Sequence, residues 1–163
     1  MILTIARHGK AHQYSESGTD RDRELKPRGH RQAEFLGRAL ATLETPPDRL
    51  VSSPFVRAHQ TATLLNAALD LDLLIDDRLR CGQPASSVLD CLEANSDAAS
   101  LVLVGHNPTF DDVIGLLLHG PGSTGPGLRT GEAFVLRIQP DQPVGTAELH
   151  AQFRLEKEEA PTP

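Results

Sequence analysis

Four basic side chains stand where their types and spacing allow chemistry on a phosphate group. Arg7 and His8 follow an apolar run in LTIARHG, Arg57 lies in LVSSPFVRA, and His106 follows a second apolar run in LVLVGHNP. An arginine guanidinium binds phosphate through two parallel hydrogen bonds and keeps its charge at any working pH. A neutral imidazole is a nucleophile for phosphorus, and a protonated one donates to phosphate. The four residue types therefore indicate phosphoryl transfer, which a phosphohistidine intermediate divides into two easier steps.

The elements around these residues must bring them together, because they are far apart in the sequence. In open α/β sheets, ligands bind beyond the carboxyl ends of the strands. Residues 2–6 and 100–104 are predicted strands, and they end directly before Arg7 and shortly before His106. Arg57 falls in the first turn of a predicted helix and reaches the same edge. We therefore expect one anion-binding hollow at a single rim of the sheet.

The rest of the chain is typical of an α/β layered fold, because short apolar runs alternate with helical patterns. We expect strands at residues 2–6, 49–52, 73–75, 100–104, 133–138 and 147–153, and helices at residues 27–44 and 86–94, from Pro54 and from Pro108. No repeat or linker divides the sequence, so we expect one domain over residues 1–155. The polar ending EKEEAPTP predicts a disordered tail over residues 156–163.

The composition limits the class of protein. The chain has 163 residues, of which 39% are hydrophobic and 23% charged, which is typical of a soluble globular protein. Its formal net charge of -6 argues against a nucleic-acid partner, which would need a broad basic face. The apolar run at the start is too short for a signal peptide or a membrane span. We therefore expect a cytoplasmic location and no membrane association.

The cysteines and the other histidines do not indicate a disulfide framework or a metal site. Cys81 and Cys91 are too few for either, so we expect two reduced thiols. His8 and His12 are four residues apart, but they lie in a predicted loop, and no carboxylate has a spacing typical of zinc ligands. We therefore expect no bound metal.

Three segments resemble the signature motifs of a known family. ARHGKA (6–11), SSPFVRAHQTA (52–62) and VGHNP (104–108) look like those of the histidine phosphatase superfamily, which has the phosphoglycerate-mutase-like fold. The resemblance extends through TGEAFVLRI (130–138). The small size, the RHGKA start and this last segment make the chain similar to the SixA-type phosphohistidine phosphatase branch.

The resemblance implies a fold and a site. The fold would be a three-layer α/β/α sandwich with a mostly parallel mixed central sheet. His8 would be the phosphorylated nucleophile, Arg7 and Arg57 would clamp the phosphate, and His106 would bind and polarise it. No cofactor or metal would be required.

The chain departs from the family pattern in one segment. Mutases and sugar phosphatases of the family usually carry a glutamate general acid where this chain has LRCG, and Arg80, Cys81 and Gly82 provide no carboxylate. An alkoxide leaving group needs a proton from a positioned acid, whereas the imidazole of a phosphohistidine needs that help less. The departure therefore favours a phosphorylated protein, carrying phosphohistidine, as substrate. The alternatives are a broad phosphomonoesterase for small phosphorylated substrates and a phosphate-binding module without turnover.

A substitute acid is available in the polar loop at residues 12–24, where Asp20, Asp22 and Glu24 are the candidates. We expect this loop and the Gly- and Pro-rich loop at residues 119–127 to flank the pocket. Neither contains a large insertion, so we expect an open site that admits a protein-borne phosphohistidine.

Overall fold

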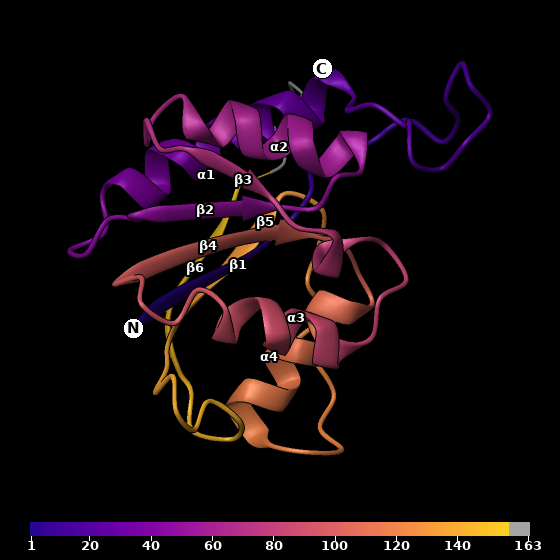
Figure 1. Cartoon of the computed structure of the whole chain (residues 1–163). Coiled ribbons are helices and arrows are strands. Elements are labelled where there is room, and N and C mark those ends of the chain that lie inside the picture. The colour runs from indigo at the N-terminus through magenta and orange to yellow at the C-terminus, as the bar shows by residue number, and fades with distance from the viewer. Residues whose placement is uncertain (157–163) are drawn as a thin grey trace, which may run out of the picture.

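The computed structural model describes residues 1–156, and these residues form one mixed sheet between two pairs of helices (Figure 1). The strands are β1 (Ile2–Arg7), β2 (Arg49–Ser52), β3 (Leu73–Ile75), β4 (Ser100–Gly105), β5 (Glu132–Arg137) and β6 (Glu148–Arg154). The helices are α1 (Pro27–Ala41), α2 (Val56–Asn66), α3 (Ala85–Glu93), α4 (Thr109–His119) and the short 3-10 helix η1 (Asp77–Leu79). The predicted disordered tail lies outside the described residues except for its first residue.

The sheet has the strand order β3-β2-β4-β1-β5-β6. The first four strands in this order run parallel, and β5 and β6 are antiparallel to their neighbours. Helices α1 and α2 cover one face, and α3 and α4 cover the other (Figure 1). The predicted three-layer α/β/α sandwich with a mostly parallel mixed sheet is therefore confirmed.

The two faces of the central strand β4 carry the two halves of the core. Leu101 and Leu103 belong to the apolar cluster formed with α3 and α4, whereas Val102 and Val104 belong to the cluster formed with α1 and α2. All four are fully buried. A parallel strand covered on both faces needs apolar residues at every position, which explains the unbroken run SLVLV.

Two helix boundaries differ from the prediction by two or three residues because side chains compete for backbone hydrogen bonds, whereas α3 and the start of α4 are shifted by one residue. Helix α1 ends at Ala41 instead of residue 44, where the Thr42 hydroxyl donates to the Ala39 carbonyl at 2.7 Å. Helix α2 begins at Val56 instead of Pro54, because the Ser53 hydroxyl accepts from the Phe55 backbone N–H at 3.2 Å and holds a turn before the helix.

The short helix η1 was not predicted from the sequence. Its start is capped by the Asp76 carboxylate, which accepts a hydrogen bond from the Arg78 backbone N–H. None of the helices within residues 1–156 has the length and apolar character needed to cross a bilayer.

The register of the parallel strands fixes where the functional segments meet. Arg7 at the end of β1 pairs with Gly105 at the end of β4, and Ser52 at the end of β2 pairs with Val104. The residues that follow are held there as well, because the His8 backbone N–H donates to the Gly105 carbonyl at 3.1 Å. Three segments distant in sequence therefore end side by side at one rim of the sheet.

Candidate active site

A hollow of about 330 Å³ lies at this rim and is lined by all four predicted residues, Arg7, His8, Arg57 and His106. The expectation that they share one hollow is met. Arg7 is the last residue of β1 and His8 follows it, whereas Arg57 comes from the first turn of α2 and His106 follows β4.

The His8 side chain has its hydrogen on the nitrogen that faces away from the pocket. The ring is 7% exposed, and its Nδ1 lies 2.8 Å from the Gly9 carbonyl oxygen. A carbonyl oxygen only accepts hydrogen bonds, so Nδ1 carries the hydrogen and Nε2 keeps its lone pair. The Arg57 Nε donates to this Nε2 at 3.2 Å, which agrees with the assignment. His8 therefore presents a lone pair toward the cationic side of the pocket.

Burial keeps His8 neutral. Desolvation lowers its pKa from 6.5 to about 3, and the nearby positive charges of Arg57 and Arg7 act in the same direction, against the Gly9 carbonyl. A neutral imidazole with a free lone pair is the nucleophilic form. The pocket holds His8 in that form over the whole neutral pH range.

His106 lies beside His8, with 5.3 Å between the ring centroids. Its Nε2 is 2.8 Å from the Ser53 hydroxyl, and its Nδ1 is buried without a hydrogen-bond partner among the described residues. Burial first, and then His8 and Arg57, lower its pKa to about 3. The protonated donor considered from the sequence is therefore a neutral imidazole in this structure.

The two arginines place positive charge inside the protein. Arg57 is 3% exposed and packs over the ring of Phe55 at 5.3 Å. Arg7 donates through Nη1 to the Leu128 carbonyl at 3.1 Å, while its Nε is buried without a partner among residues 1–156. Burial lowers the Arg7 pKa, and the neighbouring charge of Arg57 lowers it further. A buried guanidinium with an unsatisfied donor favours an anion in the pocket.

Among the residues that the structure describes, Asp20 is the one carboxylate that lines this hollow. Its Oδ2 accepts from Arg57 Nη2 at 3.1 Å, and its Oδ1 accepts from Arg23 Nη1 at 2.8 Å. The hydrogen bond from Arg23 is the largest cause that lowers the Asp20 pKa, so this side chain is an anion near neutrality. Among the three candidate acids from the sequence, only Asp20 reaches the pocket.

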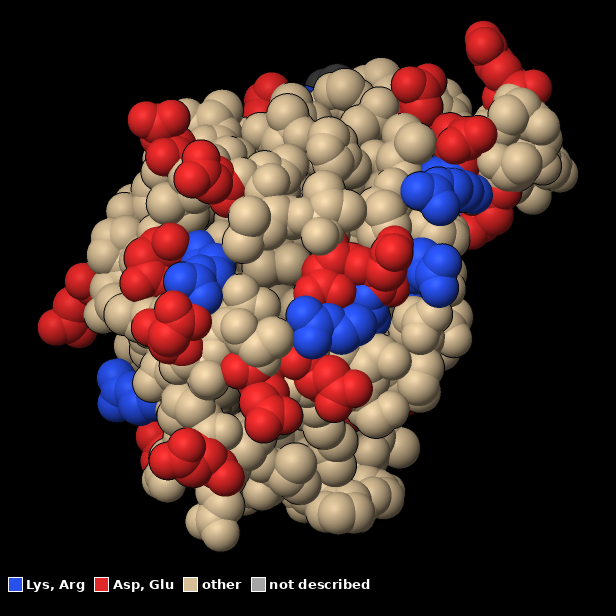
Figure 2. Space-filling view, viewed as in Figure 1, with Lys and Arg blue, Asp and Glu red and all other residues tan. Residues whose placement is uncertain are grey.

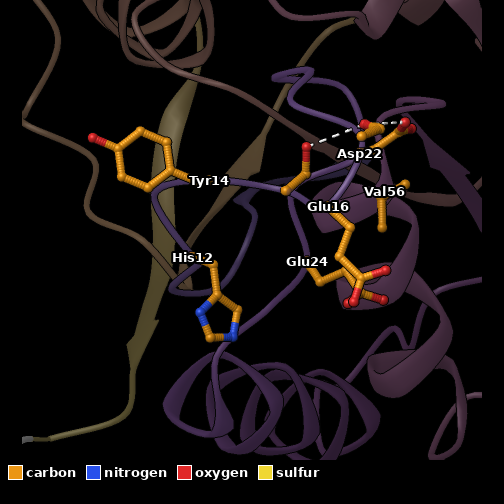
Figure 3. A pocket seen from close by; sticks show the side chains of 8 residues that line it. His12, Tyr14, Glu16, Asp22, Glu24 and Val56 are labelled. Atoms are coloured by element: carbon orange, nitrogen blue, oxygen red, sulfur yellow. Dashed lines mark hydrogen bonds between the residues drawn. The ribbon is translucent and has the colours of Figure 1, made fainter.

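Asp22 and Glu24 line a different and larger hollow of about 620 Å³ (Figure 3). Its lining also includes His12, Tyr14 and Glu16, and no lysine or arginine within residues 1–156 belongs to it. These two carboxylates therefore do not belong to the hollow that holds His8.

The segment where the family usually carries a glutamate does reach the pocket. Cys81 lines it, half-buried and free, while Cys91 is buried in the core, as the expectation of two free thiols requires. The prediction for the loop at residues 119–127 was wrong, because none of its residues lines the hollow and Thr130 does so instead. The Asp111 carboxylate holds that loop away by accepting from the Gly127 and Leu128 backbone N–H groups.

Sequence reasoning missed further residues at the site, among them the basic side chains of Lys10 and Arg23, which line the pocket, and the polar side chains of Ser53 and Asn107. Ser53 bonds to His106, and Asn107 donates through Nδ2 to the Leu128 carbonyl at 2.7 Å and lines the pocket. Ser53 directly follows β2, and Asn107 lies two residues after the end of β4. The rule that ligands bind beyond the ends of parallel strands was therefore the signal that could have found them.

The charge around the pocket is local. Figure 2 shows lysine and arginine in small groups separated by aspartate and glutamate on the face viewed. No group of three or more His, Cys, Asp or Glu side chains in the described part of the chain is arranged to hold a metal ion. The arrangement can therefore bind an anion at the pocket and present a neutral imidazole to it.

Comparisons with known proteins agree with this chemistry. Residues 3–80 match the family model of the histidine phosphatase superfamily (branch 1). The chain is 34% identical to a phosphohistidine phosphatase SixA homolog of Haemophilus influenzae over 125 residues, which cover 70% of this chain and 75% of that protein. It is also 34% identical to the mitochondrial serine/threonine-protein phosphatase Pgam5 of Drosophila melanogaster, over 43% of this chain and 24% of that protein.

The fold is similar to that of solved structures as well. The protein histidine phosphatase SixA complexed with tungstate superposes with a TM-score of 0.81 over 94% of this chain and 97% of that one, at 24% identity. The sequence matches and the shared fold lead to one conclusion. The chain belongs to the histidine phosphatase superfamily and is a phosphatase.

Proposed function

We propose that the protein removes a phosphoryl group from its substrate through a covalent phosphohistidine on His8. The observation that carries the proposal is the neutral His8 ring, whose Nε2 lone pair lies in a pocket with the buried Arg57 and the half-buried Arg7. In the first step, Nε2 forms a bond to phosphorus while the leaving group departs with the electron pair of the broken bond. In the second step, water attacks phosphorus, inorganic phosphate leaves, and His8 returns to its neutral form.

The other three residues bind the phosphoryl group in this proposal. Arg7 and Arg57 donate to its oxygens and offset the charge that develops in the transition state. His106 has an unpartnered Nδ1, and a phosphate dianion nearby would raise its pKa from the value of the empty pocket. Phosphate binding therefore shifts His106 toward its protonated form, which donates a hydrogen bond to the phosphate oxygens.

The substrate class we propose is a protein that carries phosphohistidine. Cys81 stands where the family usually has an acid, and Asp20 is an anion held by Arg23, so no described side chain in the pocket is a ready proton donor. An imidazole leaving group needs such a donor less than an alkoxide does. The pocket rim is open, since Lys10 and Asp20 are exposed, and the Haemophilus relative is named as a phosphohistidine phosphatase homolog.

A broad phosphomonoesterase is the second candidate, and the presence of Asp20 in the pocket favours it. If Asp20 donates a proton, alkyl phosphates become good substrates. The lowered Asp20 pKa argues against that role at neutral pH.

The test compares turnover of a phosphohistidine-bearing protein with turnover of an alkyl phosphate monoester. We expect the first to be faster, and faster cleavage of the alkyl ester would support the second candidate. We also expect an acid-labile phosphate label on the wild-type protein and none on His8→Ala, which should have lost turnover. A matched control is His30→Ala, which changes an exposed histidine on α1. Activity that survives in His8→Ala would identify another nucleophile.

A further inference from the structure

Asp20 is hydrogen-bonded to Arg57, the arginine that the proposed reaction needs in order to bind phosphate. Arg57 Nη1 donates to the Asp20 backbone carbonyl at 2.8 Å, and Nη2 donates to the Asp20 carboxylate at 3.1 Å. The remaining nitrogen, Nε, donates to His8 Nε2 at 3.2 Å. All three nitrogens of the Arg57 guanidinium are therefore engaged while the pocket is empty.

The hydrogen bonds that Arg57 makes to His8 and to Asp20 both stand in the way of the reaction. The His8 lone pair must be free to attack phosphorus, and in this structure it accepts a hydrogen bond from Arg57 Nε. A phosphate oxygen that binds Arg57 must also share or replace the Asp20 oxygens. The hydrogen bond between Arg57 and His8 must therefore break, and the hydrogen bonds between Arg57 and Asp20 must give way, when a phosphoryl group enters.

The mobile partner in this exchange is Asp20. Arg57 is 3% exposed and sits on α2, whereas the Asp20 side chain is 54% exposed and lies in the long connection between β1 and α1. Arg23 remains as a partner for the carboxylate after it leaves Arg57, since the two are 2.8 Å apart. Displacing Asp20 therefore leaves its negative charge compensated.

We propose that Asp20 is an internal competitor of phosphate for Arg57. It acts as a positioning residue, which holds Arg57 against His8 in the empty pocket and takes Arg57 back as inorganic phosphate leaves. The inference rests on the proposed function, because it assumes that the phosphoryl group binds at Arg57, and it adds what limits the affinity of that site.

The benefit of such a competitor is release of the product. A buried arginine and a half-buried one beside two imidazoles attract any oxyanion, including inorganic phosphate, and a pocket that binds its product tightly turns over slowly. A carboxylate that competes for one arginine lowers the affinity for substrate and product oxyanions together. Its removal should therefore strengthen binding and slow release.

The experiment measures binding of vanadate and of inorganic phosphate to the wild-type protein and to three variants. Asp20→Asn and Asp20→Ala remove the charge, and Asp22→Asn removes an equal charge from the same loop, at a side chain that lines the other hollow. We expect both oxyanions to bind Asp20→Asn and Asp20→Ala about 10-fold more tightly, with KM and kcat both lower, and Asp22→Asn to stay within about 2-fold of wild type. Asp20→Glu should restore weaker binding.

Four outcomes would overturn the inference. Weaker oxyanion binding in Asp20→Asn would mean that Asp20 supports the binding geometry of Arg57. An equal gain in Asp22→Asn would mean that only the net charge of the loop matters. If the wild-type protein binds neither vanadate nor phosphate, the proposed function fails together with the inference. Binding to the wild type with no gain in the Asp20 variants refutes the inference alone.

Discussion

Two hollows share the loop at residues 12–24, and they differ in almost every property that matters for function. The larger one, of about 620 Å³, is lined by three exposed carboxylates, those of Glu16, Asp22 and Glu24. Among the described residues, the smaller one, of about 330 Å³, is lined by one carboxylate, that of Asp20, and by six basic side chains, those of Arg7, His8, Lys10, Arg23, Arg57 and His106. Neighbouring residues of one loop, such as Asp20 and Asp22, therefore face different environments.

The difference shows that size does not mark the catalytic pocket. The smaller hollow contains buried polar atoms without partners, among them Arg7 Nε and His106 Nδ1, whereas the side chains of the larger one are mostly exposed to solvent. A buried group without a partner has a free-energy cost that a bound anion removes, and an exposed carboxylate has no such cost. The comparison predicts that changes in the smaller hollow have large effects and changes in the larger one small effects.

The largest effect should follow the loss of an arginine from the smaller hollow. Arg57→Ala removes a buried charged donor, and we expect kcat/KM to fall by about 10²–10³-fold, the range for loss of one transition-state donor. Arg57→Lys should not restore the rate, because lysine lacks the planar fork. The control is Arg38→Ala on the exposed side of α1, which should keep its activity. Steady-state kinetics on these variants check the prediction. Full recovery of kcat/KM in Arg57→Lys would show that only a point charge is needed at this position.

The next effect concerns stability in acid, and it comes from the buried histidines. In the folded protein, His8 and His106 have pKa values of about 3, below the unfolded value of 6.5, so the unfolded state binds more protons between these limits. The stabilisation is complete above pH 6.5 and is lost as the pH falls toward 3. Near pH 5, each histidine contributes a slope of about 1.4 kcal/mol per pH unit to the free energy of unfolding.

Urea unfolding between pH 7.5 and pH 5 measures this slope, because most carboxylates stay ionised in that range. His106→Gln should reduce the slope by about half. His12→Gln changes an exposed histidine that lines the larger hollow, and it should leave the slope unchanged. Equal slopes in all three proteins would mean that the buried rings titrate as they do in the unfolded chain.

A smaller effect on activity should distinguish alanine substitutions at two glycines of the connection between β1 and α1, Gly9 and Gly18. At Gly9, a Cβ would lie 2.6 Å from the Gly29 carbonyl oxygen, so Gly9→Ala must push the His8 segment away from α1. We expect a loss of about 1–3 kcal/mol in the free energy of unfolding, the usual cost of overpacking, together with lower activity. At Gly18, whose φ is +77° and whose Cβ would meet nothing within 4 Å, alanine should cost about 1–2 kcal/mol and leave activity unchanged. Chemical denaturation and activity assays on both variants check this, and equal activities would contradict it.

The sequence predicted the positions of the four pocket residues because they follow regular elements. Arg7 and His106 stand at the ends of strands whose apolar runs are unmistakable, and the parallel register brings such ends together. The sequence could not predict that Asp20 lines the pocket while Asp22 and Glu24 do not. Within the described residues, the connection from β1 to α1 contains only one isolated bridge, so no periodic pattern indicates which side chains turn inward.

The electrostatics of the pocket were also only partly predictable. A free imidazole pKa of about 6.5 suggested that His106 is charged in some conditions. The structure buries its ring between His8 and Phe55, whose centroids lie 5.3 Å and 5.2 Å away, and that burial dominates. Packing between distant segments sets the pKa, and the local sequence does not contain that information.

The smallest effect should come from the larger hollow, and it tests whether that hollow touches the substrate. The double variant Glu16→Gln/Glu24→Gln removes two exposed negative charges, which should raise kcat/KM for an anionic substrate by less than about 3-fold at low salt. The increase should vanish at high salt, because exposed charges are screened beyond a Debye length. Glu34→Gln, an exposed change on α1, serves as the charge control. A change of tenfold or more that survives high salt and is specific to a protein substrate would mean that the larger hollow contacts that substrate directly, and the contrast between the two hollows would no longer separate function from surface.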